Sequence, residues 1–188
     1  DPKDCLYCTN NETLHNLMIE ICHLRVSRVF LFKEQTYHGR CLVAYDGHVN
    51  DLNELNDQQR NDFMADVAQT TRAMQRAFNP EKINYGAFSD TLSHLHFHLA
   101  PKYVGGPDYP GLFRMNPGEV YLTDEEYQEM IELIKKQLLT DAEYKSAREK
   151  YEDDFRAGMG AEAVRELLAD INLDQLSREL RDSLQGAT

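Results

Sequence analysis

Three histidines stand at alternate positions in the stretch SHLHFHLAPK, which covers residues 93–102. Because side chains alternate between the two faces of a β-strand, His94, His96 and His98 should share one face. Neighbouring imidazoles would then lie roughly 6.7 Å apart, given a rise of about 3.3 Å per residue. This spacing is too long for a hydrogen bond between them, but it suits groups that flank a phosphate.

The same three side chains could instead bind a metal together or simply cover a half-exposed strand. The pattern HxHxDH of metallo-hydrolases is not met, because no Asp-His pair follows the alternating histidines. Many open metal sites also use a carboxylate, and this stretch contains none. These observations favour nucleophilic chemistry, in which a neutral imidazole attacks phosphorus and forms a covalent intermediate.

A second set of reactive side chains lies near the start of the chain, where Cys5 and Cys8 form a CxxC motif. A thioredoxin-like redox pair needs a strand before the motif, and the preceding residues have no strand pattern. A loose terminus and a structural zinc site are the other interpretations. His48 follows one predicted strand and His94 begins another, so the two could complete a closed site of two cysteines and two histidines.

The remaining cysteines, Cys22 and Cys41, lie among apolar residues and are interpreted as small buried hydrophobic side chains. Four cysteines in a chain of this size do not indicate a disulfide framework, so a cytoplasmic location is expected. No apolar run approaches the roughly 18 residues of a membrane span, and no signal peptide is visible.

The overall composition sets the class of ligand. The chain has 188 residues, with 28% charged residues and a formal net charge of -12. A nucleic-acid partner needs a basic stripe that neutralises backbone phosphates, so neither nucleic acid nor a membrane is expected as a partner. A small phosphorylated ligand is compatible, because a local cluster of donors can hold it.

The elements that would position these residues follow from periodicity and turn signals. Apolar residues at helical spacing predict a long helix over 57–78, and Pro80 ends it. Helices are also predicted over 10–24, with Asn11 as the cap, and over 123–139. Strands are predicted over 27–34, 40–46, 83–89 and 95–103.

Glycine and proline are frequent in 103–121, which predicts a long loop of the kind that often contributes to binding sites. The chain changes character after this region. Residues 141–188 contain 12 acids and 7 bases, and a stripe of leucines predicts an acidic helical extension. This extension would be either a solvated helix with one packed face or an arm that binds a partner. We therefore divide the chain into a domain over 1–140 and an extension over 141–188.

The histidine stretch HLHFHLA resembles the signature of the histidine-triad (HIT) family, and Pro101-Lys102 resembles the Pro-Arg that often closes it. The resemblance extends from CLYC through the predicted long helix to the histidine strand. It implies an α+β fold, with an antiparallel sheet and a long helix, usually as a homodimer. It also implies an enzyme that hydrolyses or transfers nucleotidyl groups, on substrates such as nucleoside phosphoramidates and dinucleoside polyphosphates.

The resemblance assigns roles to individual residues. The middle histidine of the signature is the nucleophile, which implies that His96 attacks the α-phosphorus and that His98 contacts the phosphate oxygens. Related uridylyltransferases carry glutamine at the third position, so His98 favours a hydrolase. Asn84 matches an asparagine that precedes the signature in relatives, and Thr91 keeps a hydroxyl that could donate to phosphate.

In zinc-containing members the first histidine of the triad is a metal ligand. The resemblance therefore implies structural zinc on Cys5, Cys8, His48 and His94. Relatives have Gly-Gln-Ser/Thr-Val just before the triad, whereas this chain has Ser-Asp-Thr-Leu, which places the acidic Asp90 beside the site.

These observations predict a nucleotide hydrolase that acts through a covalent nucleotidyl-histidine intermediate, with a small nucleotide as its substrate. Two alternatives stay open. One is a nucleotidyltransferase or phosphorylase, which would pass the nucleotidyl group to an acceptor other than water. The other is a zinc-stabilised nucleotide-binding protein whose main role is interaction with a partner.

Overall fold

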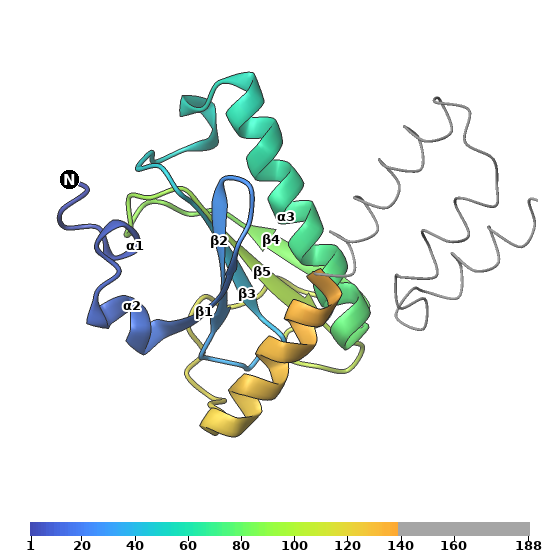
Figure 1. Cartoon of the computed structure of the whole chain (residues 1–188). Helices are drawn as coiled ribbons and strands as arrows, with labels where there is room; N and C mark the ends of the chain where they lie inside the picture. Colours follow the sequence, from blue (N-terminus) through green and yellow to red (C-terminus); the bar gives the residue numbers. More distant parts are fainter. Residues whose placement is uncertain (139–188) are drawn as a thin grey trace, which may run out of the picture. The chain divides into compact units, whose positions relative to one another are not determined.

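The structure is a computed structural model that describes residues 1–138. In this part of the chain, five strands form one antiparallel sheet with the order β1-β2-β3-β5-β4 (Figure 1). The strands are β1 (Met18–His23), β2 (Ser27–Phe32), β3 (Cys41–Tyr45), β4 (Lys82–Gly86) and β5 (His96–Lys102). The predicted α+β class with an antiparallel sheet is confirmed. The predicted helical extension over 141–188 lies outside the described residues.

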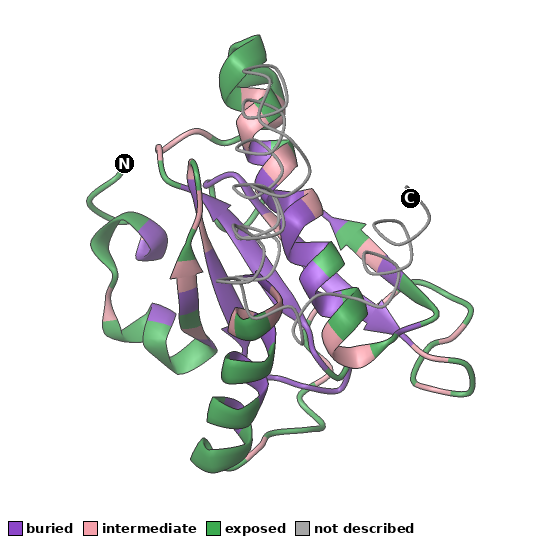
Figure 2. Ribbon diagram, turned by 45° about the vertical axis from the view of Figure 1, so that its right-hand side comes forward, coloured by how far each residue is buried: buried purple, intermediate pink, exposed green. Residues whose placement is uncertain are grey.

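The helices cover the two faces of the sheet. They are α1 (Leu6–Thr9), α2 (Glu12–Leu17), the 3-10 helix η1 (Leu52–Glu54), α3 (Asp57–Phe78) and a helix over 124–138. Apolar side chains of α1 and α2 pack with Phe30, Phe32 and Leu42 on one face. α3 lies against the other face, and buried residues line its inner side and the strands (Figure 2).

The long helix α3 begins and ends where the sequence predicts. The Asn56 side chain accepts a hydrogen bond from the Gln59 backbone, and the Gln59 side chain accepts one from the Asn56 backbone. Asn79, in the left-handed conformation, ends the helix. On the buried side, the rings of Phe63 and Phe97 have centroids 5.7 Å apart, which fixes α3 over β5.

Asp66 is a fully buried carboxylate in the middle of α3. It accepts hydrogen bonds from the backbone N–H groups of Arg25 and Val26, from the Ser27 hydroxyl and from the Arg25 guanidinium. These bonds join α3 to the turn between β1 and β2. Because each oxygen of the carboxylate is used, the ion is well compensated inside the fold.

We expect Asp66→Ala to lower the free energy of unfolding by about 3–5 kcal/mol, because the variant leaves buried donors and a cation without their acceptor. Urea unfolding would measure the loss. Asp57→Ala is the matched control, since Asp57 is exposed and pairs with Arg60 at the surface. Its cost should be below about 1 kcal/mol. Equal losses in the two variants would contradict this account of Asp66.

The predicted helix over 10–24 is wrong in its second half. The Asn11 side chain caps α2 as predicted, but α2 ends at Leu17 and β1 follows. β1 pairs with β2 along its length, with an irregularity between Glu20 and Cys22. The strand wins because its β-branched isoleucines and its backbone hydrogen bonds to β2 outweigh a short helical period.

Other sequence predictions agree with the structure. The strands predicted over 27–34, 40–46 and 95–103 contain β2, β3 and β5, whereas β4 begins one residue before the predicted 83–89 and ends three residues earlier. The Thr123 hydroxyl accepts a hydrogen bond from Glu126 N–H at the start of the 124–138 helix. Cys41 is fully buried, as predicted, whereas Cys22 is only partly buried. Within residues 1–138, none of the helices is long and apolar enough to cross a membrane.

Candidate active site and metal centre

The histidine strand has the two-faced arrangement that its alternation predicts. Phe97 packs on α3, whereas His96 and His98 lie on the opposite face, where His98 meets the Phe32 ring with centroids 6.1 Å apart. The prediction that neighbouring imidazoles are too far apart to bond is wrong. Their Nε2 atoms lie 3.2 Å apart, because the two rings lean toward each other from the strand.

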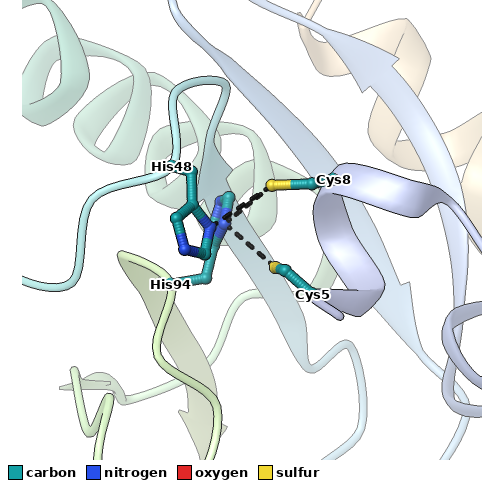
Figure 3. Close-up of side chains that lie close together, drawn as sticks. All are labelled: Cys5, Cys8, His48 and His94. Atoms are coloured by element: carbon teal, nitrogen blue, oxygen red, sulfur yellow. Dashed lines mark hydrogen bonds between the residues drawn. The ribbon is translucent and has the colours of Figure 1, made fainter. Parts of the chain in front are cut away.

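The four candidate metal ligands come from separate segments and meet at one point (Figure 3). Cys5 and Cys8 belong to the α1 segment, His48 follows β3, and His94 precedes β5. β3 and β5 are neighbours, which brings the two histidines together as the sequence suggested. The four ligand atoms all lie within 4.8 Å of one another.

The separations within this cluster fit a tetrahedral zinc ion. His94 Nδ1 lies 3.4 Å from Cys5 Sγ and 3.7 Å from Cys8 Sγ. His48 Nδ1 lies 3.4 Å from Cys8 Sγ. Zn–S bonds of about 2.3 Å and Zn–N bonds of about 2.0 Å imply ligand–ligand separations of about 3.3–3.8 Å.

The protonation of His94 also suits a metal ligand. Its Nε2 lies 2.7 Å from the Tyr45 carbonyl oxygen. A carbonyl oxygen can only accept, so Nε2 carries the proton and Nδ1 directs its lone pair toward the sulfurs. Burial lowers the pKa of His94 to about 4, which keeps the ring neutral. The residues present therefore fit zinc.

His96 lies beside the metal cluster but does not belong to it. Its Nδ1 donates a hydrogen bond to the His94 carbonyl oxygen at 2.6 Å, which leaves the lone pair on Nε2. Burial lowers the pKa of His96, so the neutral form is favoured. The ring is only 4% exposed, and Tyr7 of α1 packs against both His94 and His96, with centroids 4.8 Å and 5.2 Å away.

Arg40 is a functional candidate that the sequence analysis missed. It is fully buried at the start of β3, and its Nη2 lies 3.0 Å from His98 Nδ1. Burial and then the Arg40 cation lower the pKa of His98 to about 2. One signal was available in the sequence, since Arg40 is a lone cation that opens the apolar run RCLVAY.

The predicted long loop closes the His98 end of the site. Tyr37 OH donates to the Asp108 carboxylate, and the Arg114 guanidinium binds the same carboxylate at 3.0 Å. These contacts attach the loop to the body of the domain. They place Phe113 with its centroid 6.4 Å from that of His98.

The two predicted substrate contacts differ in their positions. Asn84 lies opposite Ala100 on β5, so it shares the face of His98, and its Oδ1 is buried without a hydrogen-bond partner within residues 1–138. Thr91 is exposed in the segment before the triad. The Asp90 carboxylate accepts the Thr91 backbone N–H at 3.1 Å, so it is engaged locally.

Comparison with known families agrees with this geometry. Residues 20–105 match the sequence model of the HIT domain. This chain contains a HIT domain. The matched region runs from within β1 through β5 and includes the whole histidine triad, and it excludes the CxxC motif.

Solved structures of HIT proteins share the fold. A histidine-triad protein from Bradyrhizobium japonicum has a TM-score of 0.63 and 19% identity, over 68% of this chain and 96% of that chain. A hypothetical histidine triad nucleotide-binding protein from Sulfolobus tokodaii has a TM-score of 0.56 and 18% identity, over 71% of this chain and 91% of that chain. A zinc-bound member from Mycobacterium smegmatis has a TM-score of 0.53 and 18% identity, over 78% and 99%.

A further similarity, to another class of protein, covers a shorter part of the chain. The chain is 61% identical over 56 residues to the DNA-directed RNA polymerase subunit beta' of Caldicellulosiruptor saccharolyticus. The matched residues make up 30% of this chain and 5% of that subunit. The chain thus spans only a small fraction of the length of the curated relatives that it matches.

Proposed function

We propose that this HIT protein is a nucleotide hydrolase that cleaves a phosphoanhydride or phosphoramidate bond through a nucleotidyl-histidine intermediate. One observation carries the proposal: the unprotonated Nε2 of His96 lies 3.2 Å from His98 Nε2. A nucleophile and a hydrogen-bond donor thus meet at one point. The nucleotide-binding protein of Sulfolobus tokodaii, which shares the fold, supports a nucleotide as the ligand.

The reaction takes place in two displacements at phosphorus. His96 Nε2 attacks the α-phosphorus, the P–N bond forms, and the bond to the leaving group breaks. The leaving group takes the electron pair and a proton from solvent. Water then attacks the same phosphorus, and the P–N electron pair returns to Nε2. One proton of the water stays on the nucleotide product, and the other goes to solvent. The net reaction consumes one water molecule.

The surrounding groups stabilise the charge that develops. The nucleotidyl-imidazole carries a positive charge, and its Nδ1–H is already donated to the His94 carbonyl oxygen. His98 Nε2–H donates to an oxygen of the phosphoryl group, and Asn84 lies further along the same face. Fixed donors of this kind usually supply a large part of the rate acceleration.

We propose a structural zinc ion on Cys5, Cys8, His48 and His94. The zinc-bound relative from Mycobacterium smegmatis supports this metal. When bound, zinc would hold the α1 segment against the ends of β3 and β5. All four positions of a tetrahedral site are then used by the protein, so the ion takes no part in bond cleavage.

The nearly complete cover over His96 adds a requirement. A ring that is 4% exposed cannot meet a phosphorus atom until its cover moves. Tyr7 lies against the His96 ring, and Phe113 lies at the His98 end. We therefore infer that α1 or the long loop withdraws when the nucleotide binds.

A covalent adduct is the expected result of rapid quenching during turnover. Incubation with nucleoside phosphoramidates and with dinucleoside polyphosphates should add one nucleotidyl group, and mass spectrometry should locate it on His96. Acid-stable labelling of another residue would contradict the mechanism. Inorganic phosphate added to the same assay would reveal transfer, through a phosphorylated nucleotide product. The homodimer and the cytoplasmic location stay predictions.

A further inference from the structure

Arg40 is a cation held without access to water beneath the proposed site. Its side chain is 0% exposed and lies between the rings of Phe32 and Phe113, with its Cζ atom 4.3 Å and 5.2 Å from their centroids. Its Nη1 donates to the Met115 carbonyl oxygen at 2.7 Å. Its Nη2 lies 3.0 Å from Nδ1 of His98.

The charge of Arg40 is poorly compensated. Glu34 is the acid beside it, but the closest approach between Nη1 and the Glu34 carboxylate is 4.0 Å. The other oxygen of Glu34 accepts hydrogen bonds from Thr36 and from the backbone of Val120. Arg40 Nε and Glu34 Oε2 are both buried without a hydrogen-bond partner among the described residues. A site that only stabilised the fold would not leave these atoms unpaired.

We propose that Arg40 is a positioning residue that fixes the tautomer of His98 and thereby directs the His98 Nε2 proton toward the lone pair of His96. The inference rests on the proposed function for its consequence in the reaction. The assignment of the His98 tautomer is independent of the proposed function, because the tautomer can be observed without any substrate.

The assignment follows from donors and acceptors along one chain of contacts. A guanidinium can only donate, so His98 Nδ1 must accept from Arg40 and the proton of neutral His98 lies on Nε2. The His94 carbonyl oxygen can only accept, so His96 carries its proton on Nδ1. The contact between the two Nε2 atoms therefore runs from the N–H of His98 to the lone pair of His96.

The opposite tautomer of His98 would place two lone pairs face to face. It would also present a lone pair to an anionic phosphoryl oxygen, and that contact is repulsive. Arg40 excludes this tautomer because a proton on His98 Nδ1 would point at the guanidinium, which has no acceptor. When a nucleotide enters, the His98 N–H can pass from His96 to the phosphoryl oxygen with no change of tautomer. The site is thus organised for the reaction before the substrate arrives.

Heteronuclear NMR of the imidazole nitrogens, on the full chain with zinc and without substrate, tests the tautomer directly. In the unmodified protein, His98 should have a protonated Nε2 and an unprotonated Nδ1 that is coupled across a hydrogen bond to Arg40. A protonated Nδ1 of His98 in the unmodified protein would overturn the proposal. This test does not depend on whether any variant folds.

Two variants separate the donor from the packing. Arg40→Met keeps the length and removes every donor, so the His98 tautomer signals should change and kcat should fall about 100-fold, with little change in KM. Arg40→Lys keeps a donor-only cation, so it should retain the tautomer and recover most of kcat. If Arg40→Met keeps either the tautomer or the unmodified kcat, the proposal fails.

Arg25→Met is the matched control. Arg25 binds Asp66 and Gln69 on the α3 face and has no contact with the triad. This variant should lose stability but keep the His98 signals and kcat. A change of the His98 tautomer in Arg25→Met would show that the signal follows stability and would overturn the role of Arg40. If no nucleotide is hydrolysed even by the unmodified protein, the proposed function fails while the tautomer result still decides the assignment.

Discussion

Replacement of His96 by alanine should lower kcat by at least about 10⁴-fold, because the variant has no group that can form the nucleotidyl intermediate. The fold and the zinc content should be unchanged. Nδ1 of His96 contacts the His94 carbonyl oxygen and Nε2 contacts His98, so neither ring nitrogen is part of the metal cluster. Steady-state assays with the nucleotide that gives the adduct would measure the loss.

His23→Ala is the control for this experiment. His23 is exposed at the end of β1 and pairs with Asp46 at the surface. It should keep the unmodified kcat, with a change in stability below about 1 kcal/mol. Circular dichroism and metal analysis of both variants would verify the fold and the zinc. An His96→Ala variant that keeps its full rate would exclude the covalent mechanism.

Cys8→Ser should release the zinc and lower the melting temperature by about 10 °C. Structural zinc sites supply folding free energy, and a loss of about 3–5 kcal/mol in a chain of this length corresponds to such a shift. The effect is expected because α1 is a single short helix whose attachment to the ends of β3 and β5 includes the metal cluster. Metal content and thermal unfolding, each with and without a chelator, would measure both changes.

Cys22→Ser is the matched control for the metal site. Cys22 lies in β1, away from the four candidate ligands, so this variant should keep one zinc ion per chain. A chelator should lower the melting temperature of Cys22→Ser and have little further effect on Cys8→Ser. Full zinc content in Cys8→Ser would contradict the assignment of the cluster.

Loss of zinc should also change the packing around the histidine triad. Tyr7 lies between Cys5 and Cys8 in the sequence, and its ring contacts both His94 and His96. An α1 segment that is freed from the metal can no longer hold this ring in place. The metal is therefore expected to organise the nucleophile through packing, without entering the chemistry.

Local signals in the sequence were strong enough to predict several elements. The apolar period and Pro80 predicted the extent of α3, and strict alternation predicted which face each residue of the histidine strand occupies. They failed for β1, where a short amphipathic segment fits a helix and a strand equally well. The choice there depends on hydrogen bonds to β2, which come from residues outside the segment.

The sequence by itself was enough to reveal the resemblance to the HIT family and to predict the chemistry of the triad and the four residues that could hold zinc, because these depend on residue types at fixed spacing. Only the tertiary structure decided that the histidine rings lean to within 3.2 Å and that Arg40 reaches His98 from the residue just before β3. It also decided that Tyr7 and Phe113 cover the site. The tilt of the two rings depends on the side chains packed around them, and Arg40, Tyr7 and Phe113 come from segments far from the triad in the chain, so no local pattern encodes these contacts.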